Sequence, residues 1–285
     1  MTGGQPLARL QRRSMVRCRR RGLAFLDPPR PSESVRDYFE DVYVDPAASR
    51  RIDTRRHGLF LDFLDGVRQE SRSRLLDIGC GTGEFIELAR ARRWDAWGVE
   101  VSREAVQTAR GRGLQVALRE SEGDEAERLP FAGAFFDVVV LWNVIEFFQR
   151  PEADLREINR VLGAGGRIVI RTQNERFHLI AHRVHRLFAW LPASNAFLGR
   201  SYVFHPVLWS RRTLAAALAR AGFIDIVVAN SAPTAGDPYG GGSRSREAVV
   251  QASKWILDHG ARVVDRISGG AWLIGASMTA VARKP

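Results

Sequence analysis

One short stretch of the chain places glycines and a carboxylate at a spacing that suits a small charged ligand. Residues 75–83 read Leu-Leu-Asp-Ile-Gly-Cys-Gly-Thr-Gly, an apolar run that ends in a Gly-x-Gly-x-Gly turn. Glycines allow positive φ and let the backbone approach a ligand where a Cβ would collide. Dinucleotide fingerprints space their glycines as G-x-G-x-x-G, and Asp77 would repel a pyrophosphate. The turn therefore favours a ligand that carries an ammonium group.

A second carboxylate, Glu100, follows the glycine turn at a sequence separation typical of residues that bind a ribose. Glu100 is the last residue of a strand predicted at 97–100, the next strand along the chain after the turn. An acid about 20 residues beyond a glycine turn accepts the hydroxyls of an adenosine ribose. The alternative is a surface carboxylate at a strand end, and the preceding turn favours the ribose role.

The region 172–210 supplies the histidines that could act as a base, because it holds four of the six in the chain. On a helix, one face would carry Ile180, Val184, Leu187, Phe188 and Leu191, and the opposite face His178, His182 and His185. A lid helix packed on its apolar side is expected, with peripheral membrane contact through 178–198 as the alternative. His178 and His205 are the candidate catalytic bases. No metal site is expected, since no acid or cysteine accompanies these histidines.

Alternating strands and helices must position these residues. Apolar runs predict five parallel strands, at 74–78, 97–100, 114–118, 135–141 and 167–171, with helices between them. Two more strands are predicted at 223–229 and 272–282, and a packing helix at 245–267. The fold class is therefore α/β, a doubly wound and mostly parallel seven-stranded sheet with a helical lid insertion at 172–210, after strand five.

Basic charge is concentrated at the beginning of the chain. The formal net charge is +11, and residues 1–30 hold eight arginines against one acid, Asp27. This segment is predicted to be a flexible basic arm, followed by one domain over 31–285 that begins with helices at 31–70. The remaining 255 residues carry only +4, so a folded surface for nucleic acid is not indicated.

Cysteine usage and hydropathy indicate the compartment. Cys18 and Cys80 are too few for a disulfide framework or a cysteine zinc site. No stretch approaches the ~18 consecutive apolar residues of a membrane-spanning helix. A cytoplasmic protein is expected, either free or peripheral to the membrane, and the oligomeric state stays open.

Five sequence pieces occur in order between residues 74 and 171, about a third of the chain. They are Leu-Asp-Ile-Gly-Cys-Gly-Thr-Gly at 76–83, Gly-Val-Glu at 98–100, Leu-Pro-Phe at 129–131, Phe-Asp-Val-Val-Val at 136–140 and Arg-Val-Leu-Gly-Ala-Gly-Gly-Arg at 160–167. Together they resemble class I S-adenosylmethionine-dependent methyltransferases, of the branch that includes quinone-biosynthesis and other small-molecule O-methyltransferases.

This resemblance implies S-adenosyl-L-methionine as the cofactor. The cofactor contacts that it implies are Asp77, Gly79, Cys80, Gly81, Gly83, Glu100, Val101, Trp142 and Asn143. The adenine contact falls on either Asp124 or Glu125, and the two alternatives stay open. Where the family reads Leu-Glu-His, this chain reads Ile145-Glu146-Phe147, which removes one familiar acid–base histidine.

The resulting expectation is an enzyme that methylates a small-molecule or lipid-like acceptor, at oxygen. One alternative is an RNA methyltransferase that uses the arginine-rich arm, although nucleic acid is not the favoured partner. The other is a non-catalytic member that binds the cofactor, which the altered Glu146-Phe147 pair would fit.

Overall fold

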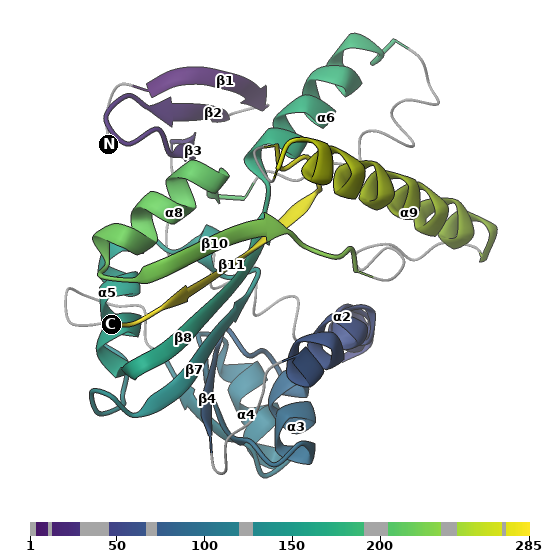
Figure 1. The fold of residues 1–285 in the computed structure, drawn as a ribbon. Helices are drawn as coiled ribbons and strands as arrows, with labels where there is room; N and C mark the ends of the chain where they lie inside the picture. Colours follow the sequence, from purple (N-terminus) through teal and green to yellow (C-terminus); the bar gives the residue numbers. More distant parts are fainter. Residues whose placement is uncertain are drawn as a thin grey trace.

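A seven-stranded sheet forms the centre of the molecule in the computed structural model (Figure 1). The structure describes residues 4–10, 13–28, 46–66, 73–119, 128–190, 205–234, 244–269 and 272–285. The strands are β4 (Arg74–Ile78), β5 (Asp95–Glu100), β6 (Gln115–Leu118), β7 (Phe136–Trp142), β8 (Leu162–Gln173), β10 (Ile224–Asn230) and β11 (Ser277–Arg283). Their order is β10-β11-β8-β7-β4-β5-β6, and β11 runs antiparallel to both of its neighbours. The other neighbouring pairs are parallel, so the predicted fold class is confirmed.

Helices cover both faces of this sheet because its strands are apolar on both sides. One face carries α2 (Pro46–Gly66), α3 (Glu84–Ala91) and α4 (Arg103–Gly111), and the other carries α5 (Pro151–Val161) and α8 (Arg211–Arg220). Successive residues of β4 divide between the two cores: Leu75 packs with Phe85 of α3, and Leu76 with Leu155 of α5. Of the helices expected at 31–70, the described part is α2.

The beginning of the chain differs from the flexible arm that the sequence predicted. β1 (Gly4–Leu10), β2 (Arg13–Cys18) and β3 (Ala24–Asp27) form an antiparallel sheet, whose fourth strand is β9 (Val207–Leu208). This sheet has its own small core, made by Met15, Ala24, Leu26, Leu179 and Leu208. Two of these five residues come from far along the chain, so the apolar pattern of the first 30 residues does not reveal the core. The proposed boundary at residue 30 lies outside the described residues.

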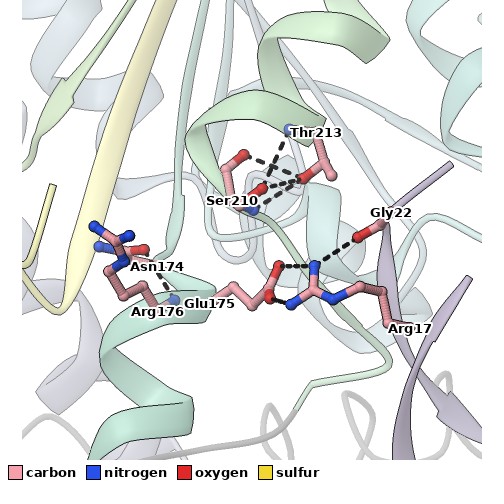
Figure 2. A network of polar contacts seen from close by, with 7 residues as sticks. All are labelled: Arg17, Gly22, Asn174, Glu175, Arg176, Ser210 and Thr213. Atoms are coloured by element: carbon pink, nitrogen blue, oxygen red, sulfur yellow. Dashed lines mark hydrogen bonds and ion pairs between the residues drawn. The ribbon is translucent and has the colours of Figure 1, made fainter. Parts of the chain in front are cut away.

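An ion pair fastens this small sheet to the main domain. The guanidinium of Arg17 lies against the carboxylate of Glu175, and its Nη1 donates to the Gly22 carbonyl at 2.8 Å (Figure 2). Glu175 is in the first turn of α6 (Glu175–Leu187), and its side chain is only 4% exposed. Burial raises the pKa of Glu175, and the neighbouring Arg17 opposes that rise. Figure 2 also shows the capping box between Ser210 and Thr213 that begins α8.

Helix α6 turns its apolar face outward, whereas the sequence predicted a lid packed on that face. Ile180 and Leu187 are exposed, and His178 and His182 are buried. The rotation of the helix is fixed by contacts of the opposite face: Leu179 enters the small core, and His178 bonds to the chain before β11. Leu191 lies outside the described residues.

Helix α9 (Arg244–Ile267) shows the same difference from its prediction as a packing helix. Its side chains Ile256, Val263 and Ile267 are exposed to solvent, and only Ala261 of its apolar residues is fully buried among those whose burial is described. The amphipathic pattern was thus a sound guide to helix formation but not to the face that packs.

We expect Arg17→Met to lower the free energy of unfolding by about 2 kcal/mol, because it leaves the buried carboxylate of Glu175 without its cation. Adding Glu175→Gln to this variant should restore most of the loss, since a neutral amide costs less to bury. Urea unfolding of the single and double variants measures both effects. If the two variants are equally unstable, the ion pair does not hold the small sheet in place.

Candidate active site

The glycine turn after β4 has the backbone conformation that its sequence predicted. Gly79, Gly81 and Gly83 have φ values of 73°, 54° and 91°, all in the left-handed region. A Cβ on Gly79 would lie 2.4 Å from Val144 Cγ2, and one on Gly83 would lie 2.3 Å from Leu114 Cδ1. Conformation therefore favours glycine at all three positions, and space also requires it at Gly79 and Gly83.

Glu100 joins this turn to the loop after β5. Its Oε2 accepts a hydrogen bond from the Gly81 N–H at 2.8 Å. Its Oε1 accepts from the N–H groups of Val101 at 2.7 Å and Ser102 at 3.0 Å. The side chain is buried, so the carboxylate sets the distance between the two loops. A nucleoside bound at this edge of the sheet would lie beside both of them.

Three predicted contacts lie at the carboxyl ends of neighbouring strands, on the same face of the sheet. Asp77 of β4, Glu100 of β5 and Trp142 of β7 are all buried. By the alternation of side chains along a strand, each points to the face covered by α2 and α3. Cys80 is buried in the turn after β4, takes part in no disulfide, and donates from its thiol to the Gly81 carbonyl at 3.7 Å. The structure thus brings together the acids and the turn that the sequence assigned to one ligand.

The end of β7 offers a test of whether a ligand fits here. Trp142 packs against Phe60, Phe63 and Phe85, with ring centroids 5.1, 5.6 and 5.4 Å away. Its indole Nε1–H is buried and donates to no group in the described part of the chain. A buried donor without a protein acceptor is uncommon, and a bound ligand can supply the acceptor. Together, two buried acceptors, Asp77 and Glu100, and this one buried donor fit a ligand that has an ammonium group and several oxygens.

A buried polar network lies next to these groups, at the ends of β7 and β8. Asn143 accepts a hydrogen bond from the Arg171 guanidinium and donates one to Glu146 Oε1 at 3.3 Å. Thr172 Oγ1 donates to Glu146 Oε2 at 3.0 Å. Burial raises the pKa of Glu146, while the bonds from Thr172 and Asn143 and the charge of Arg171 oppose the rise. The sequence analysis missed Arg171 and Thr172, and the acid of the Ile145-Glu146-Phe147 motif was the signal that pointed to them.

The two candidate bases have different surroundings. His205 is half-buried, with its Nε2 2.7 Å from Nε2 of Gln173, the last residue of β8, and its ring 4.9 Å from that of Phe147. His178 is buried on α6, and its Nε2 donates to the Ala276 carbonyl at 3.2 Å. Burial lowers the pKa of His178 to about 4, and the Ala276 bond only partly opposes this. His178 is therefore neutral and held by the backbone at neutral pH.

Two predicted contacts cannot be placed. Asp124 and Glu125, the alternatives for the adenine contact, lie outside the described residues. Within the ranges that the structure describes, no three His, Cys, Asp or Glu side chains come together in a way that could hold a metal ion.

Comparison with known proteins agrees with this geometry. The sequence profile of a methyltransferase domain matches residues 49–227. The chain is 29% identical over 149 residues to an ajmaline N-methyltransferase of Rauvolfia serpentina, covering 47% of this chain and 50% of that protein. It is 30% identical over 148 residues to a ubiquinone biosynthesis O-methyltransferase of Azoarcus sp., covering 49% and 62%.

The likeness extends to the fold of solved structures. A SAM-dependent methyltransferase from Thermotoga maritima superposes with a TM-score of 0.52 at 20% identity, over 87% of this chain and 98% of that one. The chain spans about half the length of the curated relatives it matches. By their names, the relative from Rauvolfia serpentina methylates nitrogen and the relative from Azoarcus sp. methylates oxygen.

The buried His178 should make the folded protein sensitive to acid. Its pKa is about 4 in the folded protein and 6.5 in the unfolded chain. Between pH 6.5 and 4, His178 is therefore protonated in the unfolded chain but still neutral in the folded protein, which favours unfolding. Stability should fall as the pH drops from 6.5 to 4, by about 2–4 kcal/mol from this residue.

His178→Gln should remove most of that loss, because its amide can still donate to Ala276 and does not titrate. Urea unfolding across this pH range measures the difference, with His185→Gln on the same helix as the control. A wild-type slope retained by His178→Gln would show that this histidine is not the group responsible.

Proposed function

Because the chain belongs to the methyltransferase domain family, we propose that it transfers the methyl group of S-adenosyl-L-methionine to a small-molecule or lipid-like acceptor, at oxygen. The observation that carries the proposal is the pair of buried carboxylates, Asp77 and Glu100, at adjacent strand ends beside a positive-φ glycine turn. These groups suit the ammonium and ribose of this cofactor.

The cofactor supplies a methyl carbon already activated by a sulfonium, so the protein's main task is to hold two molecules in position. Asp77 would accept from the ammonium group and Glu100 from the ribose hydroxyls. Backbone groups of Gly79, Cys80 and Gly81 would lie along the cofactor, and Val101 beside the ribose. Asp124 or Glu125 would accept from the adenine amino group, as the family resemblance implies.

Trp142 ends β7 and Asn143 follows it, and both would lie beside the reacting centre. The polar network around Glu146 fixes the Asn143 side chain, because Arg171 holds its oxygen and Glu146 holds its nitrogen. Asn143 also has a φ of 60°, a left-handed conformation that asparagine tolerates better than most side chains do. The network would keep this end of the site rigid while the acceptor approaches.

A hydroxyl acceptor must lose its proton, and we assign that role to His205. Its ring lies against Phe147, the residue that replaces the histidine of the family motif, so an imidazole is present next to that place although the motif lacks one. Gln173 can serve both protonation states of His205: its amide N–H₂ donates to a neutral Nε2, and after a flip its oxygen accepts from a protonated one. His178 is the weaker candidate, because burial lowers its pKa to about 4.

Nucleic acid is a less suitable acceptor. In the folded N-terminal sheet, Arg17 is paired with Glu175, and Arg21 lies 3.0 Å from Glu152. These pairs neutralise part of the charge that a nucleic-acid arm would need. A non-catalytic member would bind the cofactor but form no S-adenosylhomocysteine, and turnover distinguishes it from an enzyme.

We expect Glu100→Ala to weaken S-adenosyl-L-methionine binding by about 1.5–3 kcal/mol, the scale of hydrogen bonds to a charged group. Glu104→Ala, which removes an exposed acid in the first turn of α4, is the matched control and should leave the affinity unchanged. Isothermal titration calorimetry on folded variants measures both. Wild-type affinity in Glu100→Ala would show that Glu100 neither binds the cofactor nor shapes its site.

His205→Ala should reduce the rate of S-adenosylhomocysteine formation by about 10²–10⁴-fold, the usual contribution of a general base. Cofactor affinity should not change, since His205 comes from the 172–210 insertion and not from the glycine turn. His185→Ala is the control for loss of a histidine from the same insertion. A rate that stays within a few-fold of wild type across the pH range would exclude His205 as the base.

A further inference from the structure

Exposed apolar side chains gather on two helices of the molecule. Fourteen large apolar side chains are exposed in the described ranges, and eleven of them lie on or directly after α6 and α9. They are Ile180, Val184, Leu187, Phe188, Trp190, Trp255, Ile256, Leu257, Val263, Ile267 and Trp272. We call these eleven residues the α6–α9 surface. Such a concentration marks an interaction site, because single exposed apolar residues are normally scattered.

The two helices are tied together where they leave the main sheet. Asn174, which caps α6, donates from Nδ2 to the carbonyls of Leu273 at 3.0 Å and Gly275 at 2.9 Å, just after α9. His178 adds its bond to Ala276. Figure 1 shows both helices projecting from the end of the sheet where β8 finishes. The α6–α9 surface therefore begins beside the end of β8, where Gln173 contacts His205.

The charge around this surface is positive. Arg176, Arg183 and Arg186 are exposed on α6 among its apolar residues. The one acid of α6, Glu175, is buried and paired with Arg17, so it does not offset these three arginines. On α9 between residues 252 and 267, three basic residues stand against two acids, and the carboxylate of one of them, Asp258, is held by Arg262 at 2.9 Å; the residues are Lys254, Arg262 and Arg266, and Asp258 and Asp265. A partner for this surface must be apolar and negatively charged.

The exposed tryptophans indicate the kind of partner. The chain has seven tryptophans, and the three that are exposed all belong to this surface: Trp190 at 75%, Trp255 at 58% and Trp272 at 61%. Tryptophan is favoured at the headgroup level of membranes, where one side of its ring is apolar and the other wet. Helices that combine arginines with Trp, Phe and Leu lie in the membrane interface.

We propose that the α6–α9 surface docks on an anionic lipid membrane. A second copy of the chain is a poorer occupant, because a two-fold interface would bring the arginines of one α6 close to those of the other. In the described part of the chain, no helix has both the length and the apolarity needed to cross a bilayer. The two helices would therefore lie in the headgroup region and not span it.

Docking has a consequence for the acceptor, one that rests on the proposed function. Helix α6 begins at Glu175, directly after β8 ends at Gln173, so a membrane under α6 lies close to the end of the sheet where methyl transfer is proposed. An acceptor held in the bilayer, with its hydroxyl at headgroup level, can reach that place without leaving the lipid. This favours a membrane lipid over a freely diffusing acceptor.

Sedimentation with vesicles tests the docking surface without requiring turnover. The intact protein should sediment with vesicles of phosphatidylglycerol and not with vesicles of phosphatidylcholine alone. Arg183→Glu with Arg186→Glu should weaken binding by at least about tenfold, since each basic residue near an anionic surface contributes about 1 kcal/mol. The matched control, Arg19→Glu with Arg20→Glu, makes the same charge change at exposed positions in the turn between β2 and β3 and should bind as wild type does.

The apolar contribution is tested in the same way. Leu187→Ser with Phe188→Ser, and separately Trp255→Ser with Ile256→Ser, should each reduce binding by about tenfold, because each removes buried apolar area at the interface. Val227→Ser, at an exposed apolar position on β10, is the control. Circular dichroism establishes that each variant is folded, and calorimetry with S-adenosyl-L-methionine establishes that the cofactor site is intact.

Three results would overturn the proposal. The first is an intact protein that does not bind phosphatidylglycerol vesicles. The second is binding that the surface variants and their controls reduce equally. The third is a pair of observations: light scattering shows a dimer that the Leu187→Ser, Phe188→Ser variant no longer forms, and the wild-type protein does not bind vesicles. None of these outcomes depends on methyl transfer, so they leave the proposed function to its own tests.

Discussion

The carboxylate of Glu100 is the constraint on which the candidate site depends. It accepts backbone hydrogen bonds from Gly81, Val101 and Ser102, so it ties the turn after β4 to the loop after β5. Without it, several buried N–H groups would lack an acceptor. The positive φ of Gly81 lets this turn pass close to the carboxylate, and a side chain there would adopt that conformation only with strain. One acid thus fixes the two loops relative to each other and can also bind part of the ligand.

The two halves of the site differ in how much of them the sequence reveals. The cofactor half is close together in the sequence: a strand, a glycine turn and an acid about 20 residues later form a pattern that the sequence alone reveals. Strand β4 accordingly has its predicted bounds. The acceptor half is built from distant segments, since His205 meets Phe147 and Gln173 only in the folded chain. Sequence reasoning could nominate His205 but not the network around Glu146.

Two errors of the sequence analysis have one physical cause. The arginine-rich beginning of the chain folds because its apolar residues pack on Leu179 and Leu208 and because Arg17 pairs with Glu175. Those same contacts turn the histidine face of α6 inward and leave its apolar face exposed. A periodic pattern identifies the faces of a helix, but the partner that arrives from elsewhere decides which face is buried. The exposed face then becomes available to a membrane.

The most direct measurement is the transfer of a labelled methyl group. The protein is incubated with methyl-labelled S-adenosyl-L-methionine and separated pools of lipid, quinone, glycan and RNA, and S-adenosylhomocysteine is measured in each. The account predicts that the label enters a lipid or quinone pool, with S-adenosylhomocysteine formed in equal amount and the methyl group on oxygen. Label in RNA, or no S-adenosylhomocysteine with any pool, would contradict it.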